Sequence, residues 1–179
     1  MKHLQHFMLG IFSALVGAEI LLRVLPVSTA TNSGYHVHPN IITYPPRHSW
    51  IASTGWDLRD AQRMQANNLG FAAEHEFESG SRAIGLIGDS YVEASMLPLA
   101  DRPAAQLERA LGGSKPVYAF GGPGSSLLDY AERIRWAYET LGVRDFGENR
   151  DQEAAAKVAA YAGTGGPTVR WHFVGGLQT

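Results

Sequence analysis

The sequence predicts an α/β domain built on a parallel sheet. Two short apolar runs, residues 83–87 and 116–120, have the length of buried strands. Each run is followed by a segment with helical periodicity, so the elements alternate as strand, helix, strand, helix. Strands that alternate with helices pair in parallel through right-handed crossovers, and the helices cover the faces of the sheet.

Residues 1–30 predict a signal peptide or a membrane anchor. Lys2 precedes an almost wholly apolar stretch, residues 7–25, and a positive charge in this position directs export. Residues 7–18 have the length of a signal-peptide core, and residues 28–30 are small enough for cleavage. The whole stretch could instead stay as an anchor, with Glu19 and Arg23 paired one turn apart. Both interpretations export the rest of the chain to the periplasm, where it is soluble or held at the cytoplasmic membrane.

Residues 31–80 are predicted to be irregular, because prolines, glycines and polar residues dominate them. Four aromatic residues in this segment either pack against the domain or line a substrate groove: Tyr35, Tyr44, Trp50 and Trp56. His36 and His38 alternate as on one face of a strand. No third ligand stands at a suitable spacing, so we expect no metal site.

The two predicted helices of the core carry recognisable ends. Pro103 is suited to the first turn of the first helix, which two glycines end at residues 112–113. Ser126 and Asp129 form a variant of the capping box before the second helix, and Gly142 ends it. The apolar stripe of this second helix is Leu127, Ala131, Ile134, Tyr138 and Leu141.

Small and polar residues follow both predicted strands of the core. Gly88, Asp89 and Ser90 follow the first strand, and a glycine-rich loop, residues 121–124, follows the second. The carboxyl ends of neighbouring parallel strands lie side by side, so Ser90 and Gly124 should converge on one crevice. A serine there is suited to be a nucleophile, provided that a base takes its proton. The backbone N–H groups of Ser90 and Gly124 could stabilise an oxyanion.

These segments, with Asn67-Asn-Leu-Gly-Phe71 upstream, resemble the SGNH/GDSL hydrolase family in its bacterial membrane-anchored, cell-envelope branch. The resemblance covers roughly residues 7–146 and implies a flavodoxin-like parallel sheet in three α/β/α layers. It implies that Ser90 is the nucleophile, within a motif that includes Gly88 and Asp89. Ser90, Gly124 and an asparagine after a third strand would form the oxyanion hole. The implied substrate is an acyl ester, on an envelope polysaccharide, with no cofactor.

The later motifs of that family are missing from this chain. A third apolar run is absent, and Asn149 is the candidate for the third oxyanion donor. No Asp-x-x-His motif occurs; His172 is the only histidine after Ser90, which makes it the candidate base, and Val169 stands where the motif has aspartate. We therefore interpret residues 81–146 as an incomplete core. Residues 147–179 form an atypical tail with an alanine-rich helix at 152–162 and a strand-like segment at 169–174. We expect a truncated or frame-shifted copy of a longer protein.

Composition narrows the function classes. The 179 residues suit one domain, and a net charge of −2 gives no nucleic-acid footprint. The absence of cysteine excludes disulfides and thiolate metal sites. Three alternatives stay open: a serine esterase, a related polysaccharide O-acetyltransferase, or a non-catalytic membrane-tethered module that binds a glycan or a partner. Without a base near Ser90, we expect feeble esterase activity or none.

Overall fold

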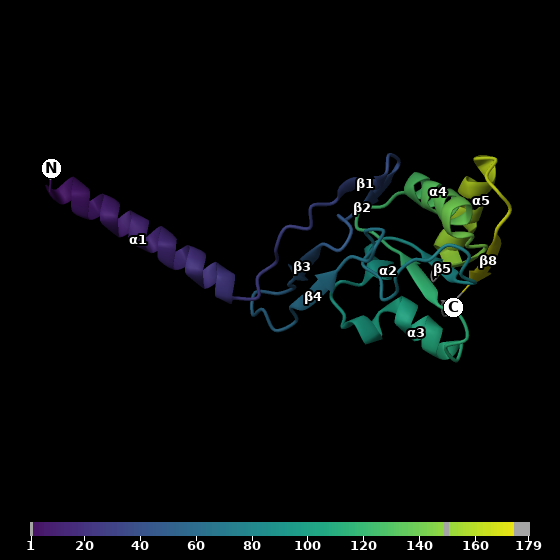
Figure 1. Ribbon diagram of the computed structural model, residues 1–179, viewed down its shortest axis with the longest axis horizontal. Helices are drawn as coiled ribbons and strands as arrows, with labels where there is room; N and C mark the ends of the chain where they lie inside the picture. The colour runs from purple at the N-terminus through teal and green to yellow at the C-terminus, as the bar shows by residue number, and fades with distance from the viewer. Residues whose placement is uncertain (1, 149–150, 174–179) are drawn as a thin grey trace.

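An apolar helix projects from the amino end of the domain. The computed structural model describes residues 2–148 and 151–173. Helix α1 (Lys2–Val24) extends away from the other elements, none of its residues is buried, and it is long and apolar enough to cross a membrane (Figure 1). Arg23 donates to Glu19 at 2.7 Å, which confirms the predicted pairing. The helix is consistent with a signal sequence or a membrane anchor.

The centre of the domain is a four-stranded parallel sheet in the order β6-β5-β7-β8. Its strands are β5 (Ile84–Ile87), β6 (Val117–Phe120), β7 (Asp145–Glu148) and β8 (Arg170–Phe173). Ile84 pairs with Val117 on one side and with Asp145 on the other. The predicted parallel pairing of the first two strands is confirmed, and the carboxyl ends of all four strands lie at one edge.

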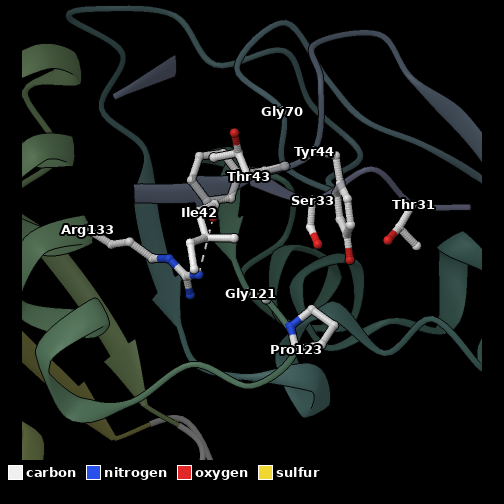
Figure 2. Close-up of a pocket in the computed structure, with 11 residues that line it drawn as sticks. Thr31, Ser33, Ile42, Thr43, Tyr44, Gly70, Gly121, Pro123 and Arg133 are labelled. Carbon is white, nitrogen blue, oxygen red and sulfur yellow. Dashed lines mark hydrogen bonds between the residues drawn. The ribbon is translucent and has the colours of Figure 1, made fainter. Parts of the chain in front are cut away.

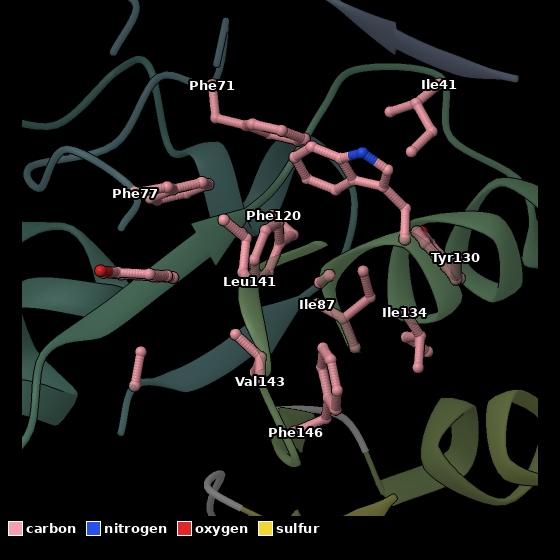
Figure 3. Close-up of a cluster of buried hydrophobic side chains, with 14 of the residues drawn as sticks. Ile41, Phe71, Phe77, Ile87, Phe120, Tyr130, Ile134, Leu141, Val143 and Phe146 are labelled. Carbon is pink, nitrogen blue, oxygen red and sulfur yellow. The ribbon is translucent and has the colours of Figure 1, made fainter. Parts of the chain in front are cut away.

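Helices cover both faces of this sheet. Helices α2 (Ser90–Glu93) and α3 (Pro103–Ala110) pack on the face that carries Leu86 and Val117, and the short helix η1 (Leu99–Asp101) precedes α3. Helices α4 (Leu127–Trp136) and α5 (Asp151–Gly163) cover the opposite face. There Ile87, Phe120 and Phe146 form the main core with residues of α4 (Figure 3). Alternate side chains of a strand point to opposite faces, so each strand contributes to both cores.

The ends of α4 follow the sequence closely, and so do Ala131, Ile134 and Leu141 of its predicted stripe, which are buried. The Ser126 hydroxyl accepts a bond from the Asp129 N–H, and the Asp129 carboxylate accepts from the Ser126 N–H, so the predicted capping box is confirmed. The helix continues as a π-helical turn (Ala137–Leu141), and Gly142 ends it at φ 73°. Leu127, predicted to be in the apolar stripe, is exposed, whereas Tyr130 and Arg133 are buried. The buried face therefore also includes Tyr130 and Arg133, and so it contains a charged residue.

Residues 31–80 contain two antiparallel hairpins rather than irregular chain alone. Strand β1 (Gly34–His38) pairs with β2 (Ile41–Thr43), and β3 (Ser49–Ala52) pairs with β4 (Gln62–Gln65). Each strand has only three to five residues, too few to show a clear alternation in the sequence. Tyr44 and Trp50 are buried, with ring centroids 4.2 Å apart, whereas Tyr35 and Trp56 are exposed.

The sheet continues past residue 146, where the sequence suggested that the core ended. β7 and β8 pair in parallel, and α5 packs against both, so the described part of the tail belongs to the same domain. The alanine-rich helix and the late strand are confirmed. Strand β7 forms with one large apolar residue, Phe146, because it pairs on both sides and Phe146 packs over Gly85; a Cβ at Gly85 would lie 2.7 Å from that ring.

Candidate functional site

The Ser90 turn joins β5 to α2. Asp89 is the N-cap of α2, and its carboxylate accepts a hydrogen bond of 2.9 Å from the Tyr91 N–H. Ser90 is therefore the first residue of the helix, and it is partly exposed. A Cβ at Gly88 would overlap the Val92 side chain, so this position needs glycine. The Gly-Asp-Ser sequence thus ends the strand, caps the helix and presents the serine at the carboxyl edge of the sheet.

The loop after β6 packs against this turn. A Cβ at Gly121 would lie 2.5 Å from the Glu93 nitrogen and 3.1 Å from the Asp89 carbonyl oxygen, so only glycine allows this approach. Arg133 also links the two strand ends, because its Nη1 lies 3.4 Å from the Gly88 carbonyl oxygen and 3.5 Å from that of Phe120. The ends of β5 and β6 therefore meet, as the parallel pairing predicts.

At this edge of the sheet, the backbone N–H groups of Ser90 and Gly124 have no hydrogen-bond acceptor among the described residues. The N–H groups of Tyr91, Val92 and Glu93 all turn toward Asp89, but those of Ser90 and Gly124 donate to no described residue. Gly124 is exposed and has φ 72°, and a Cβ added to it would meet no atom within 4 Å. Asn149, the third predicted donor, comes directly after β7 in the sequence but lies outside the described residues.

His172, the predicted base, lies at another part of the sheet. Its Nε2 is 3.0 Å from Asp145 Oδ1, and Arg170 donates two bonds to the same carboxylate, at 2.6 and 2.7 Å. Asp145 begins β7 and is level with Ile84, which begins β5, whereas Ser90 follows the end of β5. Three steps along β5 already cover about 10 Å. The structure therefore pairs His172 with Asp145 and does not bring it to Ser90.

The hydrogen bonds from Arg170 hold the pKa of Asp145 well below its usual range. Burial opposes this shift, and the bond to His172 adds to it.

None of the histidines in the described part of the chain forms a hydrogen bond with Ser90. Apart from the bond of His172, the bonds that these imidazoles make go to Asn32, Asn40, Ala30 and Glu108. Nor does this part of the chain hold three His, Asp or Glu side chains grouped as metal ligands.

A buried polar cluster supports α2 from beneath. The Tyr44 hydroxyl donates to Glu93 Oε2 at 2.7 Å, and Glu93 is only 3% exposed. Burial raises the pKa of Glu93, while the bond from Tyr44 and the charges of Arg102 and Arg133 oppose that rise. Burial lowers the pKa of both arginines. The cluster ties the helix that carries Ser90 to the end of β2 and to α4.

A pocket of about 250 Å³ lies beside this cluster. Figure 2 shows Arg133 reaching toward it from α4, with Ile42, Thr43 and Tyr44 of the amino-terminal segment opposite the loop at Pro123. Ser90 is not among the residues that line it. Tyr44 therefore packs against the domain, as one interpretation of the loop aromatics predicts, and it also lines this cavity.

Sequence reasoning missed the buried charges of this site. Arg133 could have been assigned to the buried face of its helix. It follows Tyr130 by three residues and precedes Ala137 by four, so the three side chains share one face, and both neighbours are buried. Glu93 and Tyr44 carried none, since they are 49 positions apart and meet only in the folded chain. Comparison with known proteins adds no relative: no family model, curated protein or solved structure matches the chain.

Proposed function

We propose that this chain is a membrane-tethered α/β domain of the SGNH/GDSL hydrolase type, with Ser90 as a nucleophile toward acyl esters. The observation that carries the proposal is the meeting of the Ser90 turn with the glycine loop after β6 at one sheet edge. The strand order β6-β5-β7-β8 corresponds to 2-1-3-4 in sequence, which supports a flavodoxin-like sheet. In such sheets ligands bind outside the carboxyl ends of the strands.

The residues at this edge would divide the chemistry as follows. The Ser90 oxygen attacks the acyl carbonyl carbon and gives its proton to water, and the Ser90 and Gly124 N–H groups donate to the oxyanion that forms. The C–O bond to the alcohol then breaks, the alcohol leaves with a proton from water, and a second water molecule hydrolyses the acyl-serine. Asp89 does not face substrate in this scheme; it caps α2 and so fixes the position of Ser90. Asn149 would follow the neighbouring strand β7 and add a third donor.

The expected rate is low, because no described histidine is bonded to Ser90. Loss of the base from a serine site costs on the order of a thousandfold or more in rate, and the oxyanion donors alone leave residual catalysis. We therefore expect slow hydrolysis that depends on Ser90.

Hydrolysis of p-nitrophenyl acetate by the full chain in detergent tests this proposal. Ser90→Ala should remove the enzymatic part of the rate, while Ser95→Ala, a change at a nearby serine outside the turn, should leave it unchanged. Equal rates in the wild-type chain and in Ser90→Ala would show that Ser90 is not a nucleophile.

The tether places this edge outside the cytoplasm in our proposal. The basic start and exposed apolar helix α1 support export, with the domain in the periplasm, and they make an acyl ester of an envelope polysaccharide the proposed substrate. Alkaline phosphatase fused after Pro39 should be active. An inactive fusion, beside an active cytoplasmic reporter fused at the same position, would contradict the proposed orientation.

A second function is favoured by a different observation. His172 is engaged with Asp145, and the pocket beside Arg133 does not include Ser90. A tethered module that binds a ligand without turnover needs the pocket and not the base. Ser90-independent binding together with no Ser90-dependent hydrolysis would select this function over the esterase.

A further inference from the structure

The pocket beside the Ser90 turn has one charged residue among the described residues that line it. Its walls include Ile42, Phe71 and Pro123, which are apolar, and the hydroxyl-bearing residues Thr31, Ser33 and Thr43 also line it. The charge comes from Arg133, which enters from α4 (Figure 2). A cavity with apolar walls and one fixed cation suits a ligand that has an anionic end and an uncharged body.

Arg133 has donors that the protein does not use. The residue is only 3% exposed, and no described carboxylate lies within ion-pair distance of it. Its Nη1 donates to Ser125 Oγ at 2.7 Å, but its Nη2 reaches only the Ile42 carbonyl oxygen, at 3.5 Å. Its Nε has no partner, and neither has the buried hydroxyl of Thr43 on the same pocket. Buried donors without partners are costly, so a partner from outside the chain would be strongly favoured.

The charges buried around Arg133 do not balance. Apart from the pair formed by Glu148 and Lys157, the buried charged residues in the described part of the chain are Arg102, Arg133 and Glu93. Two buried cations thus have one buried carboxylate; Glu74 also acts on Arg102 and Asp129 on Arg133, but Glu74 is exposed and Asp129 is only partly buried. Asp129 lies one turn before Arg133, but its carboxylate already accepts bonds from the N–H and hydroxyl of Ser126. An anion in the pocket would restore the balance.

The geometry favours a carboxylate over a phosphate. Nε and Nη2 lie on one edge of the guanidinium, and such an edge matches the two oxygens of a carboxylate. A Cβ at Gly122 would lie 2.7 Å from Nη2 and 3.4 Å from Nη1, so the glycine leaves space at the end of the guanidinium. A phosphate dianion would need further cations or N–H donors, and the lining residues supply no second cation.

The size and the hydroxyl groups limit the body of the ligand. The volume, about 250 Å³, is just below the range of about 300 to 1,000 Å³ that drug-sized ligands occupy. One ring fills such a space, and the hydroxyls of Thr31 and Ser33 can exchange hydrogen bonds with hydroxyl groups on it. We infer that this pocket binds a sugar acid, or one unit of a polymer of sugar acids, with its carboxylate on Arg133 and Thr43. This binding does not require Ser90 chemistry.

Isothermal titration of the full chain in a zwitterionic detergent tests the inference. The probes are galacturonate, its uncharged counterpart galactose, and inorganic phosphate; none is an ester, so hydrolysis by Ser90 plays no part. We expect saturable binding of galacturonate, and binding of galactose at least tenfold weaker. Arg133→Gln should weaken galacturonate binding at least tenfold. Arg135→Gln, which removes a guanidinium from the same helix but outside the pocket, should leave it unchanged.

Several results would overturn the inference. These are no saturable binding of galacturonate, equal binding of galactose, or unchanged binding after Arg133→Gln. Tighter binding of phosphate than of galacturonate would show that the ligand class is wrong. If Arg133→Gln fails to fold, Ser33→Phe decides the question, because Ser33 is exposed and a phenyl ring there fills the pocket without touching the buried bonds of Arg133. Galacturonate binding that survives Ser33→Phe would likewise exclude this pocket. If the natural ligand is a polymer of sugar acids, that polymer should displace galacturonate from the pocket. If the natural ligand is a free sugar acid, the polymer should bind no more tightly than galacturonate.

Discussion

Gly121→Ala is the change that most directly tests how the Ser90 turn is held. The added methyl group would lie 2.5 Å from the Glu93 nitrogen, 3.0 Å from the Val92 carbonyl carbon and 3.1 Å from the Asp89 carbonyl oxygen. All three are backbone atoms, so no side chain can rotate away, and either the loop or α2 must shift. Overpacking of this kind costs about 1–3 kcal/mol, and backbone contacts place the expected cost in the upper part of that range.

Thermal unfolding measures this cost. A change of 1 kcal/mol shifts the Tm of a domain of this size by about 2–4 °C, so we expect a fall of roughly 4–12 °C. Gly163→Ala is the matched control, because no atom lies within 4 Å of the added methyl and the glycine ends α5 with an ordinary φ. The loss should also lower Ser90-dependent hydrolysis, since α2 carries Ser90. An unchanged Tm in Gly121→Ala would refute the close packing of the two loops.

Three further predictions concern charge and exposure. Because the pKa of Glu93 is raised above 4.5 in the folded chain, its contribution to stability falls as the pH rises above that value; urea unfolding should show this fall in the wild-type chain and not in Glu93→Gln. The pKa of Asp145 is lowered, chiefly by the bonds from Arg170, so Asp145→Asn should be less stable than wild type near neutral pH. That difference should shrink as the pH falls below about 3.8. Trp56 is 96% exposed in the loop between β3 and β4, and Figure 1 shows this loop on the side where α1 joins the domain. Tryptophan favours the membrane–water interface, so we expect Trp56 to contact lipid when α1 is inserted. Trp56→Ala should therefore change the free energy of unfolding by no more than about 0.5 kcal/mol and should remove the quenching of tryptophan fluorescence by brominated lipids. Equal pH profiles for either carboxyl variant, or equal quenching after Trp56→Ala, would contradict the respective argument.

The central strands differ in how much of them the sequence could predict. β5 and β6 are apolar throughout apart from Gly85 and Tyr118, so both could be recognised from the sequence, together with the capped helices around them. β7 could not, because only Phe146 in Asp145–Glu148 is a large apolar residue. Its pairing on both sides replaces the signal that a hydrophobic run would give. The two hairpins before residue 66 could not be predicted for the same reason. Each has only one or two buried side chains, so its strands carry no hydrophobic run.

The candidate site divides in the same way. The positions of Ser90 and Gly124 follow from where two strands end, which is local information. Two of the partners of Arg133 are not local: they are Ile42, 91 positions away, and Gly88, 45 positions away. His172 was predicted from its position late in the sequence, but the register of β7 and β8 brings its side chain to Asp145. Side-chain partners across the sheet are set by register, and one sequence does not fix the register.

The Ser90 turn and the pocket are neighbours, and three pocket-lining residues contact the turn or α2: Tyr44, Gly121 and Arg133. Tyr44 lines the pocket and donates to Glu93, three residues after Ser90. Arg133 lines the pocket and contacts the carbonyl oxygen of Gly88, two residues before Ser90. A ligand held by Arg133 would therefore lie against the groups that position Ser90, the proposed nucleophile, with Gly121 between them. This arrangement suits an enzyme that holds the acidic sugar of its substrate next to the acyl group it attacks, and it suits equally a domain that keeps the binding half of such a site. The base for Ser90 is what distinguishes the two, because it contributes to turnover and not to binding.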